Sequence, residues 1–273
     1  MPATFVVVPQ WQGSGSSRAM RLVDGADAIR GDLPSGATRL VDVPLEAGDE
    51  QGSGVQRLSS IQIVKERVEH ELASIPGVAI VIGGDCGVEL GAIPAVIEKD
   101  AAILWFDAHP DLNTPESSPS HAFTGMILRT LLGEGPQQLV PAVALDPARV
   151  ILVGARNFDP AEDEYVAQHG LKSVGVDEFG PESLIAAVEA TGASSVYVHI
   201  DLDVLDPEDI AGIGYPQPFG IRAGALVEGL KALLARYPLA GAGITEFAPA
   251  SPEDAVEDMP TILRIIGALS AAA

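Results

Sequence analysis

Short runs of consecutive apolar residues, separated by amphipathic stretches, are the feature that most constrains how this chain can fold. The runs occupy residues 5–8, 78–82, 102–106, 150–153 and 196–200, with weaker ones at 39–43 and 241–246. Runs that are apolar throughout, rather than alternately apolar and polar, are typical of strands covered on both faces. We therefore predict a central, mostly parallel sheet that is buried between helices.

The stretches between these runs predict the covering helices. Four of them carry apolar residues three and four positions apart, with charged residues between: 58–74, 181–190, 223–236 and 255–269. Strands that alternate with helices along the whole chain predict one three-layer α/β/α domain over residues 1–273.

Two other segments are predicted to be loops. Residues 12–36 are rich in Gly and Ser near their start, and residues 113–120 hold two prolines. In open parallel sheets, ligands bind outside the carboxyl ends of the strands. The residues that follow the predicted strands are therefore the candidates for function.

The charge of the chain restricts its partners. Asp and Glu number 38 against 16 Lys and Arg, which gives a formal net charge of -22. Such a surface repels nucleic-acid phosphates and anionic lipid heads, so we expect no nucleic acid and no membrane partner. Metal ions or small cations suit it, but a solvated acidic surface without any such ligand explains the charge equally well. The single cysteine excludes an intramolecular disulfide, and residues 1–5 lack the features of a signal peptide. We expect a soluble, cytoplasmic protein.

Chemically reactive side chains follow three of the predicted strands. The motif Gly-Gly-Asp-Cys ends at Cys86, Asp-Ala-His-Pro-Asp spans 107–111, and Asp-Leu-Asp spans 201–203. Alternate positions at the end of a strand point to the same side of the sheet. Each motif can therefore direct its side chains toward one place.

Carboxylates at the mouth of an apolar sheet predict a cation. Asp107, Asp111, Asp201 and Asp203 would repel one another strongly if nothing neutralised them. Mixed carboxylate and imidazole donors, here including His109, suit Mn²⁺, Fe²⁺, Co²⁺ or Zn²⁺ better than Ca²⁺, and shared aspartates could bridge two ions. An isolated Asp-x-Asp usually belongs to a turn and a lone buried His to the core, but the two strand-end motifs together favour a metal site.

The motifs resemble the signature blocks of the ureohydrolases, the family of arginases and agmatinases. Order and spacing match from the Gly-Gly-Asp-Cys motif through residues 107–115 to residues 199–207. The resemblance implies a three-layer fold, two Mn²⁺ ions, and hydrolysis of a guanidino carbon by a hydroxide that bridges the metals. It also implies a small guanidino amino acid as substrate and is compatible with a homo-oligomer.

The resemblance assigns metal ligands residue by residue. The six matching positions are Cys86, Asp107, His109, Asp111, Asp201 and Asp203. Asp107 and Asp201 match the residues that bridge both ions. Cys86 and Asp111 match ligands of one ion, and His109 and Asp203 match those of the other.

The resemblance also assigns residues that bind the substrate. Glu246 matches the carboxylate that pairs with the guanidinium group. Asn113 and Ser120 match residues that hold the α-carboxylate, and Asp159 and Glu162 match those that bind the α-amino group. The motifs around them are closer to arginases than to agmatinases, so we expect an α-amino acid substrate.

Two positions differ from the family pattern. The family motif ends in a metal-binding His where this chain has Cys86, and a thiolate is a softer, negatively charged ligand that would weaken the Lewis acidity of its ion. If Cys86 only packs, the site is depleted or holds one metal. The second position is Thr124, which replaces a His that shuttles protons. His121 either substitutes for that catalytic His from one turn away or is an exposed loop residue.

Both differences fit a substrate that is easier to hydrolyse than arginine. Nω-hydroxylation makes a guanidino group less basic, so less metal activation and less general-acid help should suffice. With Cys in place of His in an arginase-like sequence, the chain resembles the Nω-hydroxy-L-arginine amidinohydrolases of D-cycloserine biosynthesis. This resemblance implies release of hydroxyurea and L-ornithine in antibiotic biosynthesis. The alternatives are an ordinary arginase, an agmatinase or guanidinobutyrase, and a decayed arginase that binds without catalysing.

Overall fold

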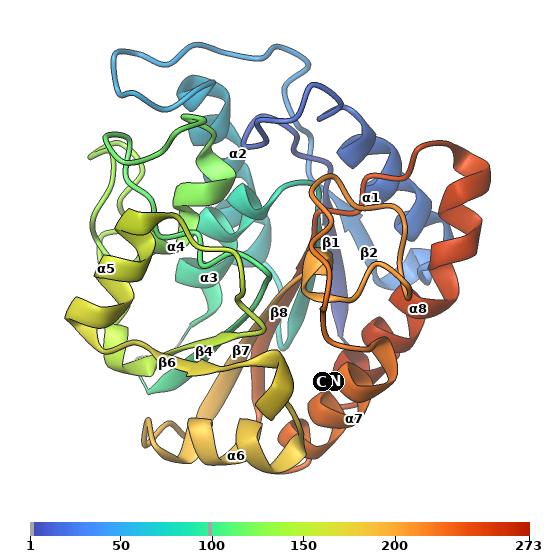
Figure 1. Cartoon of the computed structure of the whole chain (residues 1–273). Coiled ribbons are helices and arrows are strands. Elements are labelled where there is room, and N and C mark those ends of the chain that lie inside the picture. The colour runs from blue at the N-terminus through green and yellow to red at the C-terminus, as the bar shows by residue number, and fades with distance from the viewer. Residues whose placement is uncertain (1–2, 98–99) are drawn as a thin grey trace.

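A single parallel sheet lies at the centre of the structure, a computed structural model that describes residues 3–97 and 100–273. Within these residues, eight strands pair in the order β2-β1-β3-β8-β7-β4-β5-β6, and helices cover both faces (Figure 1). All the strand pairs are parallel. The predicted three-layer α/β/α architecture is confirmed.

Seven of the strands agree with the apolar runs of the sequence to within a few residues, and β6 has no predicted counterpart. They are β1 (Thr4–Val8), β2 (Thr38–Leu40), β3 (Ala79–Gly83), β4 (Ala101–Phe106), β5 (Val150–Val153), β6 (Lys172–Val174), β7 (Ser195–Asp201) and β8 (Leu239–Thr245). The helices are α1 (Arg21–Asp32), α2 (Leu58–Leu72), α3 (Glu89–Val96), α4 (Ile127–Leu131), α5 (Pro160–His169), α6 (Pro181–Glu189), α7 (Ala223–Leu234) and α8 (Pro252–Ser270).

Each face of the sheet packs against its own group of helices. Helices α1, α6, α7 and α8 bury one face, and α2, α3, α4 and α5 bury the other. Side chains alternate between the two, so Val198 faces the first group while Tyr197 and Trp105 face the second. Asp107, two positions beyond Trp105, and Asp201, four positions beyond Tyr197, fall on the second face as well.

The structure corrects one predicted loop. Residues 12–36 were expected to lack regular structure, but their second half forms α1. Leu22, Ala26 and Ile29 lie three and four positions apart and are buried on one side of this helix. The Gly- and Ser-rich stretch just before the helix is typical of a loop, and the prediction extended that loop over the helix. The predicted loop at 113–120 contains no helix or strand.

Two expectations concerned a signal peptide and a membrane partner, neither of which was predicted. Met1 and Pro2, part of the stretch judged to lack a signal peptide, lie outside the described residues. In the ranges that the structure does describe, no helix combines the length and the apolar character required to span a bilayer.

Sheet order decides where the site can form. Strands β3, β8, β7 and β4 are consecutive neighbours in the middle of the sheet. Because these strands are parallel, their carboxyl ends lie along one edge. The motifs that follow β3, β4 and β7 are therefore brought together from distant parts of the chain.

Candidate metal centre

The turn that carries Cys86 is held by the neighbouring Asp85. The Asp85 carboxylate accepts hydrogen bonds from Gln10 Nε2 at 2.7 Å and from the Gly13 backbone N–H at 2.8 Å. Burial raises the pKa of Asp85, although these hydrogen bonds lower it. A Cβ at Gly84 would overlap the Gln10 backbone, so a glycine is required where the two segments touch. Asp85 thus fixes the turn on which the cysteine is mounted.

The Cys86 sulfur lies inside a cluster of polar atoms. It is 3.3 Å from Asp201 Oδ2, 3.2 Å from Thr245 Oγ1 and 3.7 Å from His199 Nε2. The side chain is fully buried. Burial, and then the negative charges of Asp201 and Glu246, raise the pKa of this thiol well above its usual range. A bound cation would be needed to hold it as a thiolate.

A second group of donors joins the ends of β4 and β7. His109 Nδ1 is 2.8 Å from Asp203 Oδ2 and 3.5 Å from Asp107 Oδ1. Burial alone would lower the pKa of His109, but hydrogen bonds and charges from the two aspartates raise it to about 11. Burial and the charge of Asp107 raise the pKa of Asp203 to about 6. One ligand atom from each of these three residues lies within 4.8 Å of the others.

Asp111 and Asp201 complete the predicted set. Burial, and then the charges of neighbouring aspartates, raise the pKa of both carboxyls well above the usual range. Asp111 has a left-handed backbone (φ 52°), and its buried Oδ2 has no hydrogen-bond partner among the described residues. A buried oxygen without a partner and mutually repelling carboxyls are what a divalent cation would satisfy.

The donor atoms therefore fit a pair of transition-metal ions. Carboxylate, imidazole and thiol donors converge in three groups, Cys86–Asp107–His199, Cys86–Asp201–Glu246 and Asp107–His109–Asp203, and this mixture suits Mn²⁺, Fe²⁺, Co²⁺ or Zn²⁺. Asp201 lies in one candidate group with Cys86, and Asp107 lies in another with His109.

A cavity of about 200 Å³ opens above these donors. It is lined by four of the predicted metal ligands, His109, Asp111, Asp201 and Asp203. The five predicted substrate residues also line it, namely Asn113, Ser120, Asp159, Glu162 and Glu246. The structure thus brings the two predicted sets to one place.

The predicted residues for the α-amino group also shape the start of α5. Asn113 Nδ2 donates to Asp159 Oδ2 at 2.8 Å, which joins two predicted substrate residues directly. Glu162 accepts hydrogen bonds from the backbone N–H groups of Asp159 and Leu112, at 2.8 and 2.9 Å. Burial raises the pKa of Glu162 to about 7. Glu162 is therefore held in a capping box, with both oxygens already bonded.

Glu246 is fixed from two sides. Its Oε1 accepts hydrogen bonds from Thr124 Oγ1 at 3.0 Å and from the Cys86 backbone N–H at 3.3 Å. Its backbone is left-handed (φ 66°) and its N–H donates to the Gly84 carbonyl at 2.7 Å. Burial, and then the charge of Asp85, raise the pKa of Glu246 to about 8.

The predicted catalytic residue His121 lies elsewhere. Its side chain is exposed, and its Nδ1 is 3.2 Å from the Gly54 carbonyl. The backbone of His121 is left-handed (φ 54°). The cavity is lined instead by its neighbours Ser120, Ala122 and Thr124. The structure therefore does not bring His121 to the site.

Several side chains that support the donors were missed by sequence reasoning. Trp105 Nε1 donates to Asp107 Oδ2 at 3.2 Å, and Asn157 Nδ2 is 3.1 Å from His109 Nε2. His199 contacts Cys86, as described above. Trp105 stands two positions before Asp107, which directly follows β4, and His199 stands two positions before Asp201 on β7, so strand alternation could have pointed to them.

Comparisons with known proteins agree on one family. A family model described as the arginase family matches residues 19–264. An arginase of Staphylococcus aureus is 30% identical over 193 residues, and this match spans 66% of the chain but only 64% of that arginase. An arginase of Bacillus subtilis is 30% identical over 233 residues, which cover 73% of the chain and 78% of the relative.

Solved structures agree in fold. The crystal structure of an arginase from Entamoeba histolytica in complex with L-ornithine superimposes with a TM-score of 0.86. That likeness covers 98% of this chain and 97% of the other, at 24% sequence identity. A Bacillus subtilis arginase gives a TM-score of 0.83 at 23% identity and covers 98% of both chains.

Proposed function

The chain belongs to the arginase family, and we propose that it hydrolyses Nω-hydroxy-L-arginine to hydroxyurea and L-ornithine with the help of two divalent metal ions. The observation that carries this proposal is the position of Cys86. Its sulfur lies 3.3 Å from Asp201 within the donor cluster, where the family motif carries an imidazole. This activity would give the chain a role in antibiotic biosynthesis.

Six residues would hold the ions, which we propose to be Mn²⁺: Cys86, Asp107, His109, Asp111, Asp201 and Asp203. Asp107 and Asp201 are proposed to be shared between the two ions. When bound, divalent ions supply Lewis-acid chemistry that makes a water molecule nucleophilic near neutral pH. Their charge would also offset the repulsion that raises the pKa values of Asp111 and Asp201.

The substrate would lie in the cavity above these residues. Glu246, buried and held by Thr124, would accept hydrogen bonds from the guanidino N–H groups. Asn113 and Ser120 would bind the α-carboxylate at the opening, and Asp159 the α-amino group. Glu162 would act mainly by holding the loop before α5, because its oxygens are bonded to backbone N–H groups.

The reaction adds one water across a C–N bond. The oxygen of water bonds to the guanidino carbon, and the bond from that carbon to Nε breaks. Nε takes a proton and leaves as the side-chain amine of ornithine, while the carbon leaves in hydroxyurea.

A hydroxylated substrate fits the residues at positions 86 and 124. A thiolate donates more charge to its ion than an imidazole does, which weakens the activation of the nucleophile. Thr124 cannot exchange protons near neutral pH, and its hydroxyl is committed to Glu246. The electron-withdrawing hydroxyl of the substrate makes its guanidino carbon easier to attack, so the reaction demands less of both positions.

Competing substrates distinguish this proposal from an ordinary arginase. The full chain, loaded with Mn²⁺ and checked for metal content, is assayed on Nω-hydroxy-L-arginine, L-arginine and agmatine. We expect kcat/KM to be greatest for the hydroxylated substrate, by about tenfold or more, equivalent to at least about 1.4 kcal/mol of transition-state stabilisation. Equal or faster hydrolysis of arginine would identify an ordinary arginase. A fully loaded protein that releases neither urea nor hydroxyurea would be a binding protein.

A further inference from the structure

A row of buried polar side chains leads from the Cys86 sulfur into the layer between the sheet and α3. His199 Nε2 is 3.7 Å from Cys86 Sγ, and His199 Nδ1 is 2.8 Å from Glu89 Oε1. The Tyr197 hydroxyl donates to Glu89 Oε2 at 2.6 Å. Glu89 and His199 are fully buried and Tyr197 is 1% exposed. None of these three residues has a place in the reaction described above.

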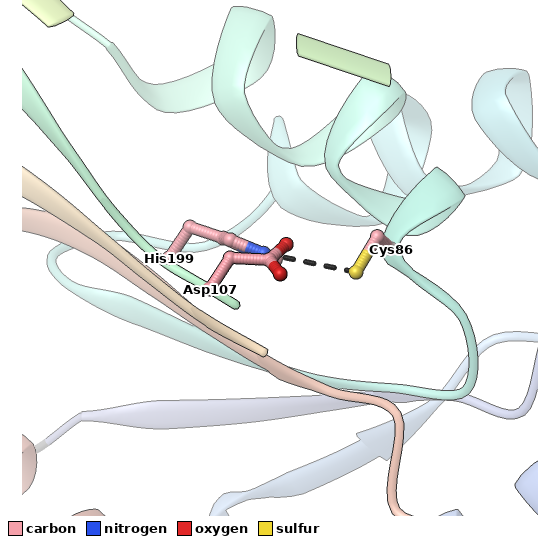
Figure 2. A group of neighbouring side chains, drawn as sticks. All are labelled: Cys86, Asp107 and His199. Atoms are coloured by element: carbon pink, nitrogen blue, oxygen red, sulfur yellow. Dashed lines mark hydrogen bonds between the residues drawn. The ribbon is translucent and has the colours of Figure 1, made fainter. Parts of the chain in front are cut away.

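Local structure explains why the row forms. Tyr197, His199 and Asp201 occupy every second position of β7, so all three side chains lie on the face covered by α3. Glu89 begins α3, three residues after Cys86. Figure 2 shows the ring of His199 beside the Asp107 carboxylate, with its contact to Cys86 drawn as a dashed line.

The carboxylate of Glu89 occupies space that is open because residue 243 is a glycine. Gly243 lies beside His199 in the register between β7 and β8, and a Cβ at Gly243 would overlap Glu89 Oε1. Burying a carboxyl group and an imidazole costs free energy unless both are hydrogen-bonded. Here each Glu89 oxygen has a partner and each His199 nitrogen faces one, so the buried row is fully paired.

The ring of His199 is also held by stacking. It packs on the Trp105 ring with centroids 3.6 Å apart and an interplanar angle of 23°. The same Trp105 donates to Asp107 Oδ2, a predicted ligand that both ions would share. The orientation of His199 is therefore fixed by Glu89 at one nitrogen and by Trp105 on one face, which leaves Nε2 directed at sulfur.

We propose that His199 is a positioning residue for the metal centre: Glu89 and Tyr197 hold its ring so that Nε2 donates a hydrogen bond to the Cys86 sulfur and directs that sulfur toward the metal. This inference rests on the proposed metal centre and goes beyond it. A hydrogen bond to a ligand atom fixes its direction and tunes its donor strength, as carboxylate–imidazole pairs do for other metal ligands. In this chain the sulfur ligand would need this support because a thiol has no second ring nitrogen through which to be oriented.

Cobalt provides a readout that a merely structural role would not change. Co²⁺ is added to the metal-free full-length chain, and its dissociation constant is measured together with the sulfur-to-cobalt charge-transfer absorption. We expect His199→Leu to weaken Co²⁺ binding by about 10- to 100-fold and to shift or weaken that absorption. His199→Gln, which keeps an N–H donor, should recover part of both. Glu89→Gln, which keeps the shape of the side chain, should give a smaller loss.

The Cys86→Ser background separates positioning from packing. If His199 acts through sulfur, His199→Leu should change Co²⁺ affinity much less in Cys86→Ser than in the parent chain. Far-UV circular dichroism and Tm accompany each variant, and Glu89→Gln keeps the test usable if His199→Leu does not fold. An equal loss in both backgrounds, or unchanged binding and absorption in all His199 variants, would overturn the inference while leaving the metal centre intact. A parent chain that binds no Co²⁺ would overturn both.

Discussion

Thr124 Oγ1 donates a hydrogen bond to Glu246 Oε1 at 3.0 Å, across 122 positions of sequence. Thr124 stands where the family pattern places a proton-shuttling His, yet its hydroxyl is bonded to the carboxyl proposed to receive the guanidino group. This position would therefore serve to hold Glu246 in place instead of moving protons.

Removing that hydrogen bond should lower activity on the proposed substrate. In Thr124→Val the shape is kept but the hydroxyl is lost. A hydrogen bond to a charged group contributes about 1.5–3 kcal/mol, so kcat/KM for Nω-hydroxy-L-arginine should fall by about 10- to 100-fold. Thr124→Ser, which keeps the donor, is the matched control and should stay close to the parent. A fall of the same size in Thr124→Ser would mean that the methyl group, not the hydroxyl, matters.

Replacing the sulfur ligand should change the choice of substrate. Cys86→His restores a neutral imidazole, which takes less Lewis acidity from the ion, so we expect faster hydrolysis of L-arginine at full Mn²⁺ loading. Cys86→Ser, matched in size, should not gain arginase activity. Metal content is measured for each variant beside the rate. If the fully loaded His variant shows no gain, then the ligand at position 86 does not limit arginine hydrolysis.

The metal-free protein should lose stability as the pH rises. The pKa values of Asp203, Glu162 and Glu246, about 6, 7 and 8, are higher than their ordinary values of 3.8 and 4.5. The folded state then binds protons that the unfolded state has released, so the free energy of unfolding falls between about pH 4 and pH 8. His109, raised from 6.5 to about 11, acts in the same direction, because its stabilisation is complete below 6.5 and is lost as the pH rises toward 11.

Thermal unfolding of EDTA-treated protein across that range checks this expectation. Bound Mn²⁺ should replace the protons, so the loaded protein should keep its Tm at pH values where the metal-free form loses it. A metal-free Tm that rises from pH 5 toward pH 8 would contradict the pKa directions given above.

Asn113 should bind the α-carboxylate of the substrate. We expect Asn113→Ala to raise KM for Nω-hydroxy-L-arginine by about tenfold, which corresponds to one lost hydrogen bond to a charged group. Any activity on agmatine, which lacks the carboxylate, should change much less. Glu116→Gln, at an exposed position in the same loop, serves as the control. Equal effects on both substrates would assign Asn113 to loop structure, through its bond to Asp159.

The sequence predicted most of the sheet because each strand is buried on both faces and therefore reads as a continuous apolar run. β6 was missed because its residues Lys172 and Ser173 lie at the edge of the sheet, where burial does not demand apolar side chains. α1 was not predicted because the glycines and serines just before it are typical of a loop, although Leu22, Ala26 and Ile29 have helical spacing.

The candidate site also contains residues that could be predicted from the sequence and residues that could not. Residues grouped at strand ends, such as Asp107 and His109, could be predicted because their spacing within a single motif fixes their direction. The bond from Thr124 to Glu246 and the contact of His199 with Cys86 could not, because they join side chains from separate elements. His121 lies in the expected segment, but neither its left-handed backbone nor its contact with the Gly54 carbonyl could be predicted from the neighbouring residues.

The position of β8 in the sheet has a consequence for the folding of the chain. β8 is the last strand in sequence, yet it separates β3 from β7 and carries Glu246 just beyond its end. The middle of the sheet and the proposed guanidino-binding carboxylate are therefore complete only when β8 has paired between strands that come much earlier in the sequence. Such late, long-range pairing slows folding. The donor residues that follow β3 and β7 should accordingly reach their final separation only after β8 has inserted between these two strands.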